Sequence, residues 1–250
     1  MTLGDKLTEG KTKIIYAHPT KDDVVYMVHK DGITAGDGAR RDVLPGKGVL
    51  ACRTTSNVFY LLEDEGINTH YIGMAAPNVN IVARCTMIPL EVVMRRIATG
   101  SYLRRHPDIA EGARFEPVIV ETFLKDDARH DPLVTDEEIV AMGVATPDEV
   151  EAMRRTGRRV FEVLEAAWAA HEVTLVDCKI EFGRAASDGT LLVADVIDND
   201  SWRIWPGGDK HRMLDKQIYR DMPEVTDAGL QALYATYAQV ADLTDTFVEE

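Results

Sequence analysis

Alternating and clustered apolar residues in the first third of the chain predict short β-strands interrupted by one helix. Lys13–Tyr16 and Val24–His29 are β-branched and aromatic runs, and the polar residues between them predict a turn. Further along, apolar positions spaced near 3.6 residues predict a helix over Val49–Glu65, with Gly66 as its C-cap. The pattern therefore predicts a strand-rich part that reaches to about Ile88.

From Pro89 onward the pattern indicates longer helices with clear start signals. Pro89 suits the first position of a helix over PLEVVMRRIA, because its missing N–H would be unpaired there anyway. Thr-x-x-Glu capping boxes begin at Thr135 and at Thr146, and the second opens a helix predicted to reach about His171. A last amphipathic helix is predicted over 227–248. We expect an α+β fold with a strand-rich part at 1–88 and a helix-rich part at 89–250.

Composition narrows the function classes. The chain has 250 residues, with 28 Lys plus Arg against 42 Asp plus Glu, which gives a net charge of −14. This charge argues against a general binder of nucleic acid or anionic membranes, because such binding needs a basic surface. Three separated cysteines and the lack of a long apolar run indicate a cytoplasmic protein without disulfides, a thiolate zinc site or a membrane span.

Two glycine-containing segments near the N-terminus are candidates for anion binding. EGKTK lacks the spacing and the following helix of a phosphate-binding P-loop, so it predicts a turn into a strand with Lys11 and Lys13 on one face. An anion between the two ammonium groups and ordinary solvated lysines remain alternatives. DGITAGDGAR (31–40) has three glycines that permit close backbone approach to a ligand, although an ordinary loop explains it equally well.

The segment RRIATGSYLRR is more specific. It places four arginines around a Gly-Ser turn: Arg95, Arg96, Arg104 and Arg105 around Gly100 and Ser101. Arginine forks match phosphate oxygens, which predicts a phosphorylated small molecule as ligand. The alternative, arginines that complement a helix dipole, leaves the adjacent Gly-Ser unexplained.

The strongest chemical signal lies in two consecutive strands. In LVDCKIEFG the period of two puts Asp177, Lys179 and Glu181 on one face and the apolar residues in the core. The next run, LLVADVIDND, predicts a central strand that carries Asp195. Glu181 and Asp195 on adjacent strands suit Mg²⁺, which takes a few protein oxygens together with substrate phosphates. An ion-pair network around Lys179 is the alternative.

A polar loop, KDDARHDP (125–132), has few apolar residues to anchor it. It is either a solvated loop or a loop that closes over substrate and supplies Lys125 and Asp131.

Taken together, these motifs resemble the SAICAR synthetase family. IPLEVVMRRIATGS and LVDCKIEFG look like its two signature segments, and the other motifs follow in the family's order from about Leu7 to the final helix. Arg96, Val196 and Asp198 depart from many bacterial members and are similar to the synthetase part of the animal bifunctional enzyme. The carboxylase part of that enzyme has no counterpart here, so a single activity is expected.

The resemblance implies an α+β fold related to ATP-grasp enzymes and protein kinases. It also implies an ATP-dependent ligase of purine biosynthesis that joins L-aspartate to the carboxylate of carboxyaminoimidazole ribotide (CAIR), giving SAICAR, ADP and phosphate through an acyl phosphate. ATP, Mg²⁺, CAIR and L-aspartate are the expected ligands, and a homo-oligomer, preferably a dimer, is the expected assembly. Another ATP-dependent ligase, a kinase-like phosphotransferase and a catalytically silent nucleotide-binding regulator are the competing hypotheses.

The resemblance also implies roles for individual residues. The general base is left open between Asp131 and Asp37, with His130 as a third candidate, and Lys125 is expected to act beside it. The remaining expected sites are Lys11, Lys13, Met87, Glu91 and Lys125 for the nucleotide, Glu181 and Asp195 for Mg²⁺, and Arg95, Gly100, Ser101, Asp177, Lys179 and Arg203 for the ribotide.

Overall fold

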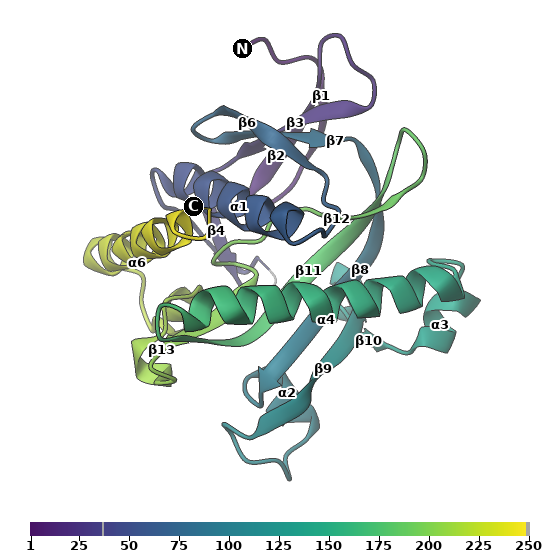
Figure 1. Cartoon of the computed structure of the whole chain (residues 1–250). Coiled ribbons are helices and arrows are strands. Elements are labelled where there is room, and N and C mark those ends of the chain that lie inside the picture. The colour runs from purple at the N-terminus through teal and green to yellow at the C-terminus, as the bar shows by residue number, and fades with distance from the viewer. Residues whose placement is uncertain (37, 249–250) are drawn as a thin grey trace.

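Two antiparallel sheets, with helices packed against them, make up the fold (Figure 1). The structure is a computed structural model that describes residues 1–36 and 38–248. The expected α+β class is confirmed by the mixture of helices and sheets. Within the described residues, no helix combines the length and the apolar character that crossing a membrane requires.

The first sheet has five strands in the order β1-β2-β3-β7-β6 and carries helix α1 on one face. The strands predicted from the sequence are β2 and β3, and the predicted helix is α1; all three are confirmed, and Gly66 follows α1 with the positive φ of a C-cap glycine. The elements of this part are β1 (Lys6–Glu9), β2 (Lys13–Ala17), β3 (Val24–His29), α1 (Lys47–Asp64), β6 (Tyr71–Ala76) and β7 (Val79–Ala83). A separate hairpin pairs β4 (Gly32–Ala35) with β5 (Arg40–Val43).

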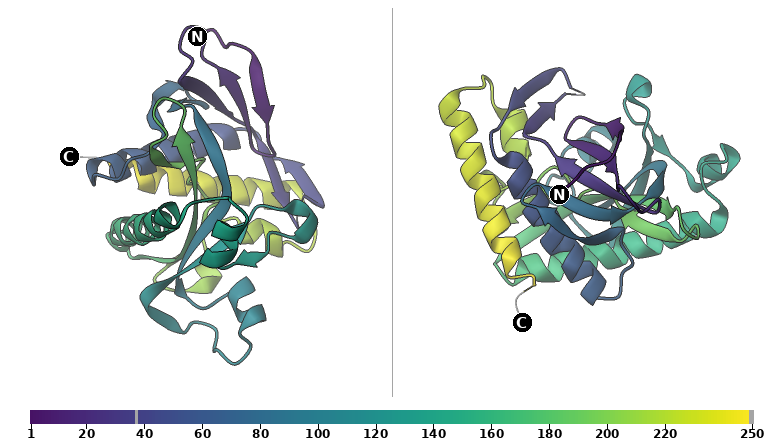
Figure 2. Two further views of the ribbon diagram at one scale, coloured as in Figure 1. Left: turned by 90° about the vertical axis from the view of Figure 1, so that its right-hand side faces the viewer. Right: turned by 90° about the horizontal axis from the view of Figure 1, so that it is seen from above.

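The second sheet runs in the order β10-β9-β8-β11-β12, and β13 pairs with the first half of β11 while β12 pairs with its second half. Its strands are β8 (Cys85–Ile97), β9 (Arg114–Leu124), β10 (Leu133–Val134), β11 (Val173–Ala185), β12 (Leu191–Ala194) and β13 (Trp202–Pro206). Helix α4 (Pro147–Ala169) lies along one side of the long strands (Figures 1 and 2). Its predicted apolar stripe is buried, with Trp168 wholly inaccessible, so this helix forms the main core with the sheet.

The remaining helices are shorter, except for the last one. They are α2 (Ser101–Arg105), a 3₁₀ turn at Asp127–Arg129, α3 (Asp136–Ala141), a 3₁₀ turn at Lys210–Arg212, α5 (Gln217–Asp221) and α6 (Asp227–Asp245). The two predicted capping boxes are confirmed at α3 and α4. Helix α6 packs beside α1 (Figure 1), and this contact joins the end of the chain to its first third.

The helix expected over PLEVVMRRIA is wrong, because this segment lies within strand β8. Every second residue, Leu90, Val92 and Met94, points into the core, which is the period of two of a strand. β-branched residues such as those in this segment also favour a strand over a helix. Pro89 lies where the pairing of β8 with β11 is irregular: Glu91 pairs with Glu181 and Met87 with Gly183, so the register shifts between them. At such an irregularity the missing N–H of proline costs no ladder hydrogen bond.

Three further expectations are corrected by the fold. Lys11 precedes β2, so it does not share a strand face with Lys13. Strand β12 ends at Ala194 and lies at the end of the sheet, so Asp195 is not in a central strand but follows it, with φ +70°. The second part of the chain contains six strands besides its helices, because long runs such as β8 and β9 are buried on a sheet. The division at residue 88 stays a prediction, and that position falls within β8.

Candidate active site

The face of the second sheet that points away from α4 carries a row of charged residues on β8 and β11. Met94 and Val92 lie 3.0 and 3.2 Å from the position of a Cβ on Gly157 of α4, so the alternate residues of β8 face the other way. On that other face Glu91 pairs in register with Glu181 of β11, and Arg95 pairs with Asp177. The charged face predicted from the period of two in LVDCKIEFG is therefore confirmed.

A first cavity of about 490 Å³ lies between the two sheets, a volume suited to a small organic ligand. Its walls are mostly apolar, and Met87 is one of them, as expected for a residue bordering a nucleotide base. Its polar groups include Lys13, Lys125, Glu181 and Asp195. The structure thus brings together most of the residues expected for nucleotide and metal. His70, which the sequence reading did not single out, also lines this cavity.

A second, central cavity of about 470 Å³ adjoins the first and shares Lys125, Glu181 and Asp195 with it. Its lining includes four further residues from the sequence-based set: Lys11, Glu91, Asp131 and Lys179. The two lysines of EGKTK therefore reach neighbouring cavities, although they do not share a strand face.

Glu181 is the best-buried acid of this region, with 3% of its surface exposed. Its carboxylate accepts hydrogen bonds from Lys125 at 2.6 Å and from Lys179 at 2.8 Å. Burial raises the pKa of Glu181, but these lysines outweigh it and bring the pKa down to about 2. Burial alone would lower the pKa of Lys179. The carboxylates of Glu181 and Glu91 outweigh this effect and raise the pKa above its usual value. The ion-pair network considered as an alternative is thus present, and it holds Glu181 ionised.

Asp195 lies in direct contact with the ammonium group of Lys13. Burial lowers the pKa of Lys13 to about 8. Among the described residues there is no group of three or more His, Cys, Asp and Glu that could hold a metal ion alone. Two carboxylates in one cavity do fit Mg²⁺, which commonly uses one or two carboxylates and takes further oxygens from substrate phosphates. The assignment of Glu181 and Asp195 stays a prediction.

A cationic cavity of about 390 Å³ lies at the Gly-Ser turn. Gly100 has φ +59°, and a Cβ built there would lie 2.7 Å from a guanidinium nitrogen of Arg203. Glycine is therefore required for Arg203 to approach the turn. Ser101 lines the same cavity, together with three cations that the resemblance did not assign to the ribotide: Arg104, Lys210 and Arg220.

The other arginines of RRIATGSYLRR are engaged by acids. Arg95 is buried and donates to Glu121 at 2.6 Å and to Asp177 at 2.9 Å. It lines a further cavity of about 440 Å³, and Ser101 and Asp131 line that cavity too. Asp177 lines none of the cavities described here, and it also accepts from Arg203. Its expected contact with the ribotide stays a prediction.

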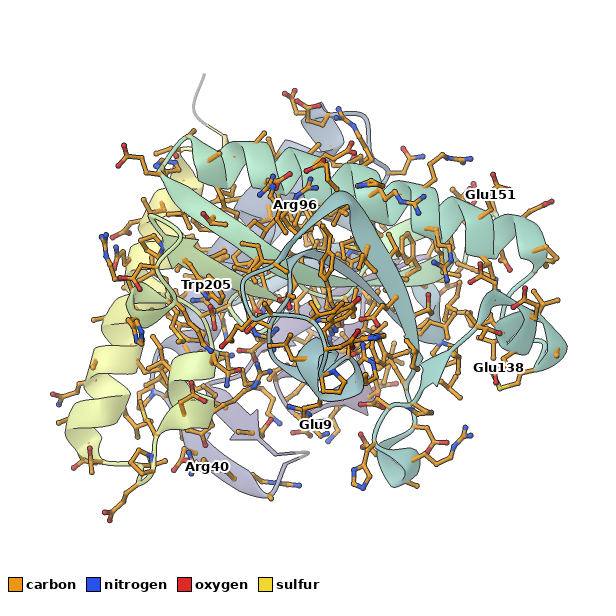
Figure 3. All side chains as sticks on the ribbon, turned by 90° about the horizontal axis from the view of Figure 1, so that it is seen from below. Glu9, Arg40, Arg96, Glu138, Glu151 and Trp205 are labelled. Carbon is orange, nitrogen blue, oxygen red and sulfur yellow. The ribbon has the colours of Figure 1, made fainter. Side chains whose placement is uncertain are left out.

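Arg96 belongs to the core. It donates two hydrogen bonds of 2.7 Å to Glu165 of α4, and Figure 3 shows it beside that helix. Arg105 contacts Glu121. The sequence pattern could not separate these two from Arg104, because the separation depends on which acids the neighbouring elements supply.

The KDDARHDP loop is held by its own side chains. Asp131 accepts the N–H of Asp126 at 2.8 Å, and the ammonium of Lys11 lies 3.6 Å from Asp127. Asp131 lines the central cavity and the one beside Arg95, and His130 lines the latter. Asp37 lies outside the described residues, so the identity of the general base stays a prediction.

The comparisons with known proteins agree with the geometry. The family model for SAICAR synthetase matches residues 6–234. The chain belongs to the SAICAR synthetase family. A phosphoribosylaminoimidazole-succinocarboxamide synthase of Roseiflexus castenholzii is 63% identical over 99% of each chain. A probable multifunctional protein of Caenorhabditis elegans is 45% identical over 96% of this chain and 58% of its own length, so the animal likeness in RRIATGS does not extend to higher overall identity.

Solved SAICAR synthetases share the fold. One from Ehrlichia chaffeensis has a TM-score of 0.87 at 31% identity and covers 96% of this chain and 98% of its own. A second, described as a complex with ADP, has a TM-score of 0.82 at 34% identity and covers 93% and 97%. The expected family and its fold are therefore confirmed for this chain.

Proposed function

We propose that this SAICAR synthetase ligates L-aspartate to the carboxylate of CAIR at the expense of ATP, giving SAICAR, ADP and phosphate. The observation that carries the proposal is a chain of adjoining cavities. The apolar cavity and the central cavity share Lys125, Glu181 and Asp195, and the central cavity shares Glu91 and Asp131 with the cavity beside Arg95. The cavity beside Arg95 shares Ser101 and Arg104 with the cationic cavity. A nucleotide bound in the apolar cavity and a ribotide bound at the arginines would bring the γ-phosphate and the acceptor carboxylate together in the central cavity. The relative in complex with ADP supports the nucleotide end.

The nucleotide is expected to lie between the sheets, with its base near Met87 and its phosphates near Lys13 and Lys125. These lysines would neutralise charge on the transferring phosphoryl group. Glu181 and Asp195 would hold Mg²⁺, which would supply further positive charge to the phosphates.

The phosphate of CAIR is expected in the cationic cavity of Ser101, Arg104 and Arg203. Anchoring at this end would hold the carboxylate of CAIR in the central cavity, where it can be phosphorylated in line. A carboxylate is a poor acyl donor, so its conversion to an acyl phosphate gives the later step a leaving group.

The amine of L-aspartate would then attack the acyl carbon and release phosphate. Asp131 and Asp37 are the proposed acceptors of the amine's proton, and the KDDARHDP loop would limit access of water to the acyl phosphate. A homodimeric assembly and a cytoplasmic location are parts of the same proposal.

A substrate-omission assay tests the function. Phosphate release from ATP should require both CAIR and L-aspartate for sustained turnover, with one phosphate formed per SAICAR. Sustained release with CAIR alone would indicate a phosphotransferase or phosphatase reaction. ATP binding by calorimetry without turnover, under all substrate combinations, would indicate a silent regulator.

A further inference from the structure

The segment DGITAGDGAR contributes to the hairpin of β4 and β5, and its last residue, Arg40, is the first residue of β5. Arg40 lines none of the cavities described above. Its side chain instead reaches α5, an element that lies far along the chain, and Figure 3 shows Arg40 at the hairpin. The hairpin is therefore joined to a helix of the C-terminal part.

Arg40 caps the C-terminal end of α5. Its guanidinium donates to the carbonyl oxygen of Tyr219 at 3.0 Å and to that of Met222 at 2.8 Å. The last carbonyl groups of a helix have no partner within the helix, so a cation that donates to them stabilises this end. The same guanidinium lies 5.6 Å from the centre of the Tyr219 ring, within the range of a cation–π contact.

Asp42, two residues further along β5, holds the same helix. The hydroxyl of the fully buried Tyr219 donates to the carboxylate of Asp42 at 2.6 Å. Burial and this carboxylate raise the pKa of Tyr219, so its hydroxyl stays protonated and remains a donor. Residues two apart on a strand share a face, so one face of β5 holds α5 at two points.

Helix α5 depends on such contacts for its position. It is five residues long, and a helix this short is not stable on its own. Two of its residues, Gln217 and Arg220, line the cationic cavity. Within residues 1–36 and 38–248, the guanidinium of Arg220 donates only to Gln217, at 3.3 Å, and forms no ion pair with an acid. The place of this cation in the cavity is therefore set by the helix that carries it.

We propose that Arg40 is a positioning residue of the reaction. By holding the C-terminal end of α5, it keeps Arg220 directed at the phosphate of the ribotide, which Arg40 itself does not touch. This inference rests on the proposed function, in which that phosphate lies in the cationic cavity. An arginine with a purely structural role would instead change stability and leave binding of the ribotide by the folded protein as it is.

A double-mutant cycle in the full chain tests the inference by steady-state kinetics. Arg40→Met and Arg220→Met should each raise KM for CAIR about tenfold and leave KM for ATP within about twofold of the parent. Because Arg40 acts through Arg220, the double variant should also show a rise of about tenfold, where independent effects would multiply to about a hundredfold. Arg40→Lys should restore KM for CAIR to within about threefold of the parent, since an ammonium group can still donate to the carbonyls.

Arg41→Met is the matched control. Arg41 is the next residue of β5, is exposed and donates to the carbonyl of Gly38 at 2.8 Å, so it does not share the face that holds α5. Its loss should leave KM for CAIR within about twofold of the parent. An unchanged KM for CAIR in Arg40→Met, or a rise of about a hundredfold in the double variant, would overturn the inference.

Tyr219→Phe decides the question if Arg40→Met does not fold, because it removes only the bond to Asp42 and keeps the buried ring. It should raise KM for CAIR about threefold in the parent and leave it nearly unchanged in Arg220→Met. Equal effects in the two backgrounds would refute the inference. Failure of the proposed function is distinct, because the parent protein itself would then form no SAICAR.

Discussion

At the scale of single residues, the cationic cavity depends on a backbone position with no side chain. Gly100 combines φ +59° with a close approach to the guanidinium of Arg203. Arg203 in turn is held by Asp177, which also binds Arg95. The position of Arg203, which is proposed to bind the phosphate of the ribotide, is thus set by a glycine and a buried acid together.

Gly100→Ala should weaken binding of the ribotide. The new Cβ would displace Arg203, and we expect KM for CAIR to rise about tenfold or more, a loss of roughly 1.4 kcal/mol of binding free energy. KM for ATP should stay unchanged. Initial-rate measurements with each substrate varied in turn check this.

Gly143→Ala is the control for backbone strain. Gly143 also has a positive φ, +70°, but no neighbouring atom lies within 4 Å of an added Cβ. Its substitution should therefore cost roughly 1 kcal/mol of folding free energy through backbone strain and leave every KM unchanged. Equal KM values for CAIR in the two variants would contradict the role of Gly100.

At the scale of elements, local signals predicted more than long-range ones. The capping boxes at Thr135 and Thr146 were predicted correctly, because both partners of each box lie within four consecutive residues. The PLEVVMRRIA segment was misread, because proline, leucine and arginine also suit a helix and only pairing with β9 and β11 makes it a strand. Pairing partners lie far away in sequence and cannot be read from the segment itself.

The first residue pair to test at this scale joins α4 to β11. Glu149 completes the capping box of α4 and also accepts hydrogen bonds from Arg184 at 2.6 and 2.9 Å. The bonds from Arg184 outweigh burial and hold the pKa of Glu149 at about 2. Glu149→Gln should lower the free energy of unfolding by about 2 kcal/mol at pH 7, measured by urea denaturation.

The effect of Glu149→Gln should depend on pH. Since the folded pKa lies below the unfolded value of 4.5, the unfolded state binds more protons in this range. The stabilisation is therefore complete above pH 4.5 and is lost as the pH falls toward 2. The difference between parent and variant should be constant from pH 7 to 5 and shrink by pH 3.5. A difference independent of pH would contradict the ion pair.

Glu151→Gln is the control, because Glu151 is exposed on the same helix (Figure 3). It should change the free energy of unfolding by less than about 0.5 kcal/mol.

At the scale of the whole molecule, the sequence predicted which motifs lie together but not which side chains pair with one another. Lys13, Lys125, Glu181 and Asp195 were expected at one site and do line one cavity. Lys216 also lines the central cavity, and the sequence did not single it out because a lone lysine in LDKQ carries no pattern.

Buried charges also connect distant parts of the chain. Lys47 at the start of α1 is 1% exposed and lies 3.6 Å from Asp200, which follows β12 and contacts Tyr237 of α6. Burial alone would lower the pKa of Lys47, but the charges of Asp200 and Asp198 outweigh this effect and raise the pKa above its usual value. The first third of the molecule is therefore joined to the last by an ion pair whose lysine is fully buried.

Lys47→Met should reduce the free energy of unfolding by about 3–5 kcal/mol, because it removes one of the two lysines that balance the buried carboxylates of Asp198 and Asp200. Guanidinium denaturation followed by circular dichroism measures this. Lys6→Met, at an exposed ion pair with Glu9, should cost less than about 1 kcal/mol. A loss below about 1 kcal/mol for Lys47→Met would show that Lys216 alone compensates Asp200.

The central claim is that ATP activates the carboxylate of the ribotide where the cavities meet. The most direct measurement uses CAIR labelled with ¹⁸O in its carboxylate, with ATP and L-aspartate, followed by mass spectrometry of the phosphate released. The account predicts that each phosphate carries one ¹⁸O atom, because the carboxylate oxygen leaves with the phosphoryl group. Unlabelled phosphate, with the departing carboxylate oxygen found in water instead, would contradict it.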